Sequence, residues 1–249
     1  NYTLMSLTKN NMSLLPLLTE VVSQSAKKDA LLKVLRKAEH KSSNWNNPYV
    51  ILVGHENVPE LTQMTAKEWQ ETQLSEKLPE RFGGRELDYP DWAGTNATGA
   101  YQFIYKTLKK MIYDYNIVGE DDIMTKEKQD EAAWGLLTRL PGDWGNLPDQ
   151  LTHEIVDRLA GLWASLPGVL SHGDCNSKYG ANNIDTAKCF KTINGWYTEA
   201  LGIEPEDVED IIVKKDTYGP TTIDDITQSK DVVEMGDKGK IVTMIQRML

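Results

Sequence analysis

The sequence has little of several features that mark particular classes of protein. Only two of its 249 residues are cysteine and only three are phenylalanine. It contains no run of about 18 apolar residues, so we expect no transmembrane helix and no membrane insertion. Lys and Arg number 27 against 37 Asp and Glu, which gives a formal net charge of -10. This acidic balance argues against a protein that binds the phosphate backbone of nucleic acids.

The two cysteines, Cys175 and Cys189, lie in a segment rich in Gly, Asn and Ser. They either close a small loop in an oxidising compartment or remain free thiols, and the sequence leaves both alternatives open. A metal site would recruit His172, but no fourth ligand stands at a compatible spacing. The four histidines form no HExxH pattern and are each expected on a helix or loop surface. We therefore expect no metal and no cofactor.

Composition divides the chain into four segments. Residues 1–24 are predicted to form an N-terminal arm, and residues 25–202 a single domain of mixed α+β class that is mostly α. Residues 203–234 are rich in Asp and Glu and form an acidic linker. The last segment, 235–249, has apolar residues at helical spacing. Neither a secretory signal nor a natural start is evident, because Pro16 and Glu20 interrupt the apolar stretch 13–22 and the chain begins at Asn1.

Within the predicted domain, capping residues and apolar spacing locate several helices. Thr65-Ala-Lys-Glu68 reads as a capping box that opens one of them, Thr125 caps another, and Ser25 is the expected N-cap of the first. The apolar run Tyr49-Val-Ile-Leu-Val53, followed by glycine, predicts a strand of a small β-sheet. The helices are expected over residues 25–39, 65–78, 100–115, 125–140, 151–165 and 185–201.

The first of these helices carries the main candidate for catalysis. In Ala30-Leu-Leu-Lys-Val-Leu-Arg-Lys-Ala-Glu39, the apolar residues recur at helical spacing and end one residue before a carboxylate. A glutamate at this place must lie close to the core, where partial burial keeps a carboxyl protonated near neutral pH. Glu39 is therefore the candidate general acid, although a lone glutamate at a helix end is ordinarily a solvated surface residue.

Several segments, in order, resemble the phage lambda endolysin family, a lysozyme-like group that cleaves peptidoglycan. The resemblance begins at Ala30–Glu39, where the family ends its first helix on the catalytic glutamate, and continues with Tyr49-Val-Ile-Leu-Val-Gly54, which is similar to its strand. Three later segments complete it: Ala97-Thr-Gly-Ala-Tyr-Gln-Phe103, Gln129-Asp130 followed by Ala132-Ala133, and Leu162-Trp-Ala-Ser-Leu-Pro-Gly168. Together they span about residues 30–168, which is more specific than any single motif.

The resemblance implies a lysozyme-like fold, with the small β-sheet beside an active-site cleft, that acts on bacterial peptidoglycan. It assigns catalysis to Glu39 and sugar binding to Tyr101 and Gln102, with Trp163 in the core beneath them. It further implies a lytic transglycosylase, in which one carboxyl serves as acid and base and the product carries a 1,6-anhydromuramic end. A hydrolase would need a second carboxylate, and Asp88, Asp91 and Glu56 are the nearest loop candidates in sequence.

The chain departs from the family at two places. His40 follows the catalytic glutamate, where the family usually has glycine, and the family's Gly-Tyr-Gly continuation is absent after Pro167-Gly168. These departures support a rival class, a non-catalytic virion component that keeps the fold as a wall-binding or structural part. A bacterial wall-remodelling enzyme is a third alternative.

The C-terminal segment bears on the choice among these alternatives. Gly236-Asp-Lys-Gly239 and the apolar residues that follow resemble the opening helix of a three-helix peptidoglycan-binding domain, which a wall-cleaving domain would complement. The arm, the linker and this incomplete module favour a virion-associated lysin. We expect it in the phage tail or core, with other tail proteins as candidate partners, acting in the periplasm or cell wall of the host.

Overall fold

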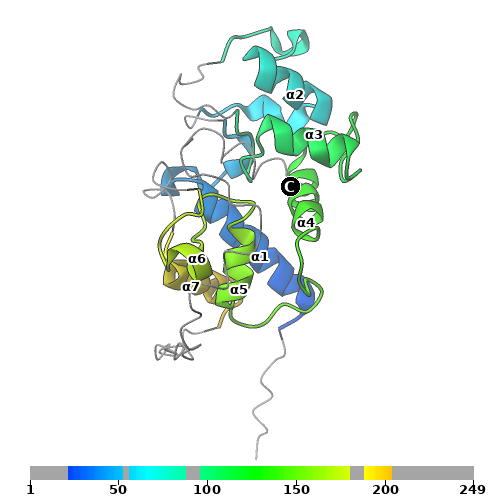
Figure 1. The fold of residues 1–249 in the computed structure, drawn as a ribbon. Helices are drawn as coiled ribbons and strands as arrows, with labels where there is room; N and C mark the ends of the chain where they lie inside the picture. Colours follow the sequence, from blue (N-terminus) through cyan, green and yellow to red (C-terminus); the bar gives the residue numbers. More distant parts are fainter. Residues whose placement is uncertain (1–21, 53–55, 88–95, 180–187, 204–249) are drawn as a thin grey trace, which may run out of the picture.

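The computed structural model describes residues 22–52, 56–87, 96–179 and 188–203 (Figure 1). The predicted arm before residue 22, most of the acidic linker and the C-terminal helix lie outside this part of the chain. The described residues form seven α-helices joined by loops and short 3-10 turns. They are α1 (Gln24–Glu39), α2 (Ala66–Ser75), α3 (Tyr105–Tyr113), α4 (Lys126–Leu137), α5 (His153–Leu159), α6 (Val169–His172) and α7 (Phe190–Ala200).

The helix α1 is the longest and lies at the centre of the arrangement (Figure 1). It contacts α7 on one side and α4 on another, and it buries seven of its side chains. The apolar stripe predicted from the sequence is confirmed, since Leu31, Val34 and Leu35 are at most 1% exposed. Its N-cap is Ser23 rather than the predicted Ser25, because the Ser23 side chain accepts a hydrogen bond from the Ala26 backbone N–H at 3.2 Å.

The other helices form two groups. The pair α2 and α3 lies at one end of the molecule, and α5, α6 and α7 lie at the other, with α1 and α4 between them (Figure 1). The capping box at α2 is confirmed, because Thr65 and Glu68 each bond the other's backbone N–H. Thr125 caps α4 as predicted. No described helix is long and apolar enough to cross a membrane.

The described residues contain no β-sheet, so the predicted strand at 49–53 and its small sheet are not found there. Residues Pro48–Val50 form a 3-10 turn, and the two residues after them make only isolated bridges, Ile51 with Asn57 and Leu52 with Thr98. Pro48 explains the difference, because its fixed φ favours the first position of a helical turn. The run is apolar because the core encloses it, with Val50, Ile51 and Leu52 at most 3% exposed.

The helix predicted over 100–115 is also shorter than expected, since α3 begins only at Tyr105. The segment before it is a tight turn in which Gly99 has φ of +76° and Gln102 has φ of +48°. Two backbone hydrogen bonds close it: the Thr98 N–H donates to the Phe103 carbonyl at 3.1 Å, and the Phe103 N–H donates to the Thr98 carbonyl at 3.0 Å. The helical spacing of Tyr101 therefore belongs to a turn packed on the core and not to a helix.

This turn depends on a glycine at position 99. A Cβ there would lie 2.5 Å from both the Gln129 side-chain oxygen and the Trp69 ring. We predict that Gly99→Ala lowers the free energy of unfolding by about 3 kcal/mol, because it combines overpacking with an unfavourable φ. The control is Gly195→Ala in α7, where a Cβ meets nothing within 4 Å and helix propensity favours alanine by up to about 1 kcal/mol. Urea unfolding of both variants tests this, and equal midpoints would contradict it.

Candidate active site

Glu39 is the last residue of α1 and its side chain is half-buried. The Ser165 hydroxyl donates a hydrogen bond to Glu39 Oε1, and the Ser165 backbone N–H also bonds the carboxylate. The apolar stripe of α1 draws the preceding turn into the core, so the carboxyl is surrounded by protein while part of the side chain stays accessible. A general acid needs both properties, because it must meet a substrate and keep its proton.

The surroundings of Glu39 raise its pKa to about 7, from an ordinary value of 4.5. Burial is the main cause, because a desolvated carboxyl resists ionisation. The two hydrogen bonds from Ser165 act in the opposite direction, since they stabilise the carboxylate. The balance leaves Glu39 able to give and to take a proton near neutral pH, which is the property expected of a single acid–base catalyst.

Ser165 is held in place by the loops around it. Its backbone carbonyl accepts from the Lys188 N–H at 2.9 Å, and its side chain is 6% exposed. Trp163, two residues earlier, is 4% exposed, which confirms its predicted place in the core. The Trp163 indole N–H donates to the Tyr101 carbonyl at 3.2 Å and so connects this segment to the turn at 99–102.

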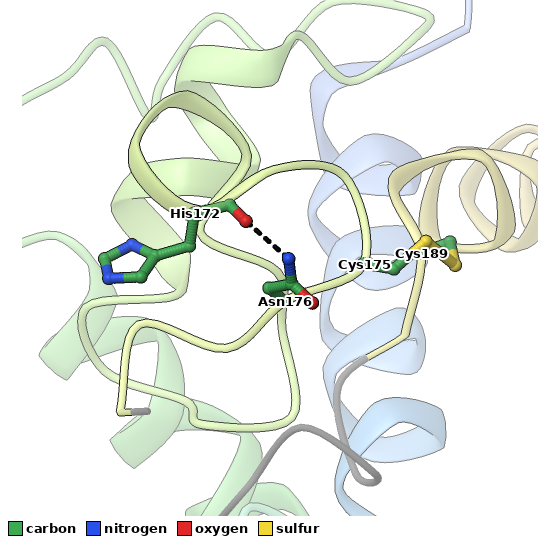
Figure 2. The surroundings of a disulfide bond; sticks show 4 residues. All are labelled: His172, Cys175, Asn176 and Cys189. Carbon is green, nitrogen blue, oxygen red and sulfur yellow. Dashed lines mark hydrogen bonds between the residues drawn. A yellow bond between two sulfur atoms is a disulfide. The ribbon is translucent and has the colours of Figure 1, made fainter. Parts of the chain in front are cut away.

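A disulfide joins Cys175 to Cys189 (Figure 2). It settles the alternative that the sequence left open. Cys189 is adjacent to Lys188, and Asn176 beside the other cysteine accepts from the Gly168 N–H at 2.7 Å. The disulfide therefore ties together the two segments that flank the Glu39 partner. His172 contributes its carbonyl to the Asn176 amide at 2.6 Å (Figure 2).

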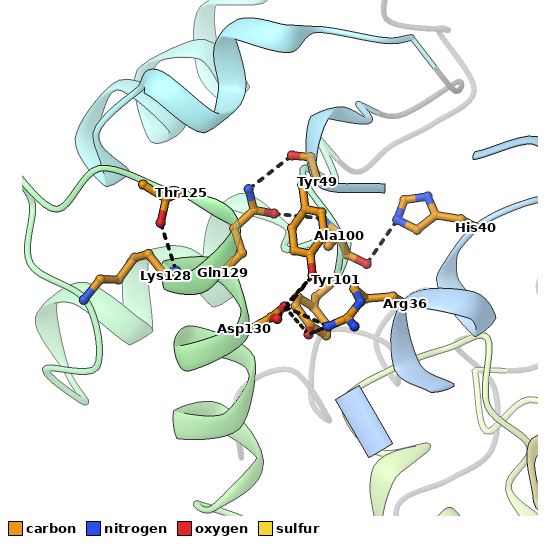
Figure 3. A network of polar contacts seen from close by, with 9 residues as sticks. All are labelled: Arg36, His40, Tyr49, Ala100, Tyr101, Thr125, Lys128, Gln129 and Asp130. Atoms are coloured by element: carbon orange, nitrogen blue, oxygen red, sulfur yellow. Dashed lines mark hydrogen bonds and ion pairs between the residues drawn. The ribbon is translucent and has the colours of Figure 1, made fainter. Parts of the chain in front are cut away.

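Tyr101, which the sequence placed in a sugar cleft, is 1% exposed and lies in a buried polar network (Figure 3). Its hydroxyl donates to Asp130 Oδ1 at 2.6 Å and accepts from Arg36 Nη1 at 2.8 Å. Arg36 also pairs with Asp130 at 2.9 Å, and the Tyr49 hydroxyl donates to the same carboxylate at 3.1 Å. Arg36 lies one turn before Glu39 on α1, so this network fixes the C-terminal end of the helix against α4.

Both tyrosines of this network have a raised pKa. Burial is the first cause for Tyr49 and for Tyr101, and the negative charge of Asp130 adds to it, while Arg36 acts in the opposite direction. The phenols therefore keep their protons throughout the physiological range and serve as donors to Asp130. This gives Tyr101 a positioning function in the network.

Gln102, the other predicted sugar-binding residue, has a half-buried side chain. Its amide donates to the Gly99 carbonyl at 2.9 Å and to the Ile51 carbonyl at 3.4 Å. These bonds stabilise the left-handed backbone at this residue and join the turn to the bridge region at 51–52. The structure therefore brings Tyr101 and Gln102 together on the same turn, but neither is bonded to Glu39.

The same turn is held from two further sides (Figure 3). The Gln129 side-chain oxygen accepts from the Ala100 N–H at 2.9 Å, and its amide donates to the Tyr49 carbonyl at 3.1 Å. His40, expected on the surface, is 4% exposed, and its ring bonds the Ala100 carbonyl at 3.1 Å. That expectation was wrong because the residue after α1 turns inward to meet this carbonyl. His40 thereby joins the end of α1 directly to the turn.

Two residues near Glu39 were not assigned a role from the sequence alone. Ser165 lies within the quoted motif Leu162–Gly168, so the motif was the available signal. Tyr179 gave no signal, because nothing in its local sequence distinguishes it. The pKa of Tyr179 is raised, chiefly by burial and also by the charge of Glu39, and its hydroxyl donates to the Gly161 carbonyl at 2.6 Å.

The candidates for a second carboxylate do not join Glu39 in the described part of the chain. Glu56 pairs with Arg85 at 2.6 Å, and Asp88 and Asp91 lie outside the described residues. No described carboxyl contributes to the raised pKa of Glu39. The described residues also contain no group of three His, Cys, Asp or Glu side chains that could hold a metal ion.

Comparisons with protein-family models, with curated proteins and with solved structures find no match for this chain. The candidate site is therefore defined by its own geometry: one desolvated carboxyl at the end of α1, bonded by Ser165. The turn at residues 99–102 is bonded by His40, Ile51, Gln129 and Trp163.

The raised pKa of Glu39 makes stability depend on pH. Glu39 holds its proton more tightly in the folded than in the unfolded state, so its protonation stabilises the fold. This stabilisation is fully present below about pH 4.5 and is lost as the pH rises through about 7. Relative to Glu39→Gln, which stays neutral, the wild-type free energy of unfolding should fall over this range by at most about 3 kcal/mol. Urea unfolding from pH 4.5 to pH 8 measures the difference. The exposed Glu71→Gln is the control, and parallel curves for wild type and Glu39→Gln would contradict the account.

Proposed function

We propose that this protein cleaves the β-1,4 glycosidic bond between N-acetylmuramic acid and N-acetylglucosamine in bacterial peptidoglycan. The observation that carries the proposal is the carboxyl of Glu39, which is desolvated, half-buried and bonded by Ser165. Cleavage of a glycosidic bond requires a proton on the leaving oxygen, and a carboxyl whose pKa is about 7 still holds one near neutral pH. The choice of peptidoglycan as the substrate rests on the ordered resemblance to the phage lambda endolysin family.

The proposed reaction is that of a lytic transglycosylase. Protonated Glu39 gives its proton to the glycosidic oxygen as the bond from that oxygen to C1 of the muramic acid breaks. The resulting carboxylate then takes the proton of the muramic C6 hydroxyl, whose oxygen forms a new bond to C1. One carboxyl completes both steps and the product has a 1,6-anhydro ring. Hydrolysis would need a second carboxylate, and among the described residues none contributes to the pKa of Glu39. This supports the transglycosylase route.

The residues around Glu39 orient its carboxyl and position the end of α1. Ser165 orients the carboxyl and stabilises its charged form for the second step. The network of Arg36, Asp130 and Tyr101 positions the end of α1. Gln102 lies on the turn held by that network. Of the two residues that the resemblance assigns to sugar binding, it is the one that is not fully buried, so it is the candidate sugar ligand.

The proposed setting is a phage virion-associated lysin with a lysozyme-like fold that acts on the wall during entry, alongside other tail proteins. The resemblance is the main support for this setting. The disulfide of Cys175 and Cys189 agrees with a protein that functions in an oxidising environment such as the periplasm or cell surface.

Mass spectrometry of soluble fragments from purified peptidoglycan tests the activity. We predict anhydromuramic ends with the wild type and a loss of at least about 1,000-fold in their rate of formation with Glu39→Gln, because the amide can neither donate nor accept the required proton. Glu56→Gln is the matched control and should retain activity, because Glu56 is paired with Arg85.

The other outcomes are informative in different ways. Reducing ends in place of anhydro ends would establish a hydrolase and require a second carboxylate. Equal activity in Glu39→Gln would remove Glu39 from catalysis. Absence of fragments from every protein, with the wall still bound, would favour the non-catalytic wall-binding alternative.

A further inference from the structure

A recess lies away from Glu39, between the N-terminal half of α1, the C-terminal half of α4 and the loop after α3. Its volume is about 510 Å³, within the range of ligand-binding clefts. We call it the α1/α4 groove. Its walls include two aromatic rings, Trp134 and Tyr115, and two cationic side chains, Lys28 and Arg139, with Asn116 and Thr138 as further polar groups.

The two cations are fixed over the two rings. Lys28 Nζ lies 5.0 Å from the centroid of Trp134, and the Arg139 guanidinium lies 5.3 Å from that of Tyr115. Arg139 Nη2 also donates to the Tyr115 carbonyl at 2.9 Å. These contacts hold both positive groups at the groove in defined places, so a ligand need not order them when it binds.

The charge of the groove is unusual for this protein. The chain has a net charge of -10, yet neither Lys28 nor Arg139 forms an ion pair with any carboxylate in the described residues. The one acidic residue of the groove, Glu131, is already paired with Lys128 at 3.0 Å. The groove therefore presents two positive charges that are not neutralised by described neighbours, and it favours an anion.

We propose that the α1/α4 groove binds a glycan that carries carboxylate groups, namely a stretch of the peptidoglycan strand away from the bond being cleaved. The guanidinium of Arg139 and the ammonium of Lys28 match carboxylates, and the half-buried rings of Trp134 and Tyr115 offer amphipathic surfaces to sugar rings. This inference rests on the proposed function for the identity of the glycan. It adds a site that is separate from the candidate active site.

The position of the groove on α1 fits this function. Lys28 precedes Glu39 by eleven residues on the same helix, which corresponds to a rise of about 16 Å along its axis. The side chains of Leu31, Leu32 and Leu35 between them are buried, so a strand that contacts both sites must pass around α1 and be longer than this distance. Binding at the groove would then keep the enzyme on the wall and raise the local concentration of bonds near Glu39.

Binding to insoluble peptidoglycan sacculi tests the proposal in a Glu39→Gln background, where cleavage does not interfere. The test variant is Lys28→Gln with Arg139→Gln, and the control is Lys109→Gln with Arg158→Gln, which removes the same charge from exposed positions on α3 and α5. We expect the apparent Kd from co-sedimentation to rise by about tenfold or more for the test variant only, since this variant loses both charge-assisted hydrogen bonds to the ligand. Urea unfolding verifies that both variants remain folded.

A second arm identifies the group that is recognised. Sacculi whose carboxyl groups have been converted to amides should bind the protein with Lys28 and Arg139 intact about tenfold more weakly than untreated sacculi do. The test variant should bind the amidated sacculi no more weakly than the untreated ones. Equal binding of test and control variants, or no effect of amidation, would overturn the proposal. Its failure is distinguishable from failure of the proposed function: fragment release with unchanged binding refutes the groove alone, and groove-dependent binding without fragment release refutes the cleavage alone.

Discussion

The site depends on the desolvation of one carboxyl, that of Glu39. The apolar stripe of α1 buries the turn that precedes it, so the charged form loses hydration and the pKa rises to about 7. Ser165 limits this shift by bonding the carboxylate with its hydroxyl and its backbone N–H. Burial alone would make a carboxyl that holds its proton too tightly to act as a base, and hydrogen bonds alone would make one that is always ionised.

The rest of the described structure holds these two residues at a fixed separation. On the side of Glu39, Arg36 and Asp130 join α1 to α4, and His40 joins the end of α1 to the turn at residue 100. On the side of Ser165, the disulfide and the Lys188 N–H hold the loop. Trp163 connects the two halves through the Tyr101 carbonyl. The segments that contain Arg36, Tyr49, Tyr101, Asp130 and Trp163 are thus joined to one another by hydrogen bonds and one ion pair.

The sequence was sufficient for the features that depend on local periodicity and capping: α1 with its buried stripe, the capping box of α2, and the Thr125 cap of α4. It failed where tertiary packing decides. The apolar run after Pro48 forms a turn and isolated bridges, and Tyr101 lies in the core although its motif predicted contact with sugar. Burial of His40 and the role of Ser165 arise from contacts across more than 50 residues, which no local pattern records.

The most direct test compares the ionisation of Glu39 with the rate of cleavage. The carboxyl ¹³C resonance of Glu39 gives its pKa, and the release of fragments from peptidoglycan at different pH values gives the kinetic midpoint. We expect both to lie near 7 and the rate to fall as the pH rises above this value. Ser165→Ala should move both upward together, because it removes a hydrogen bond to the carboxylate. A Glu39 carboxyl that titrates near 4.5, or a cleavage rate that does not follow its titration, would contradict the proposal that Glu39 is the acid–base catalyst.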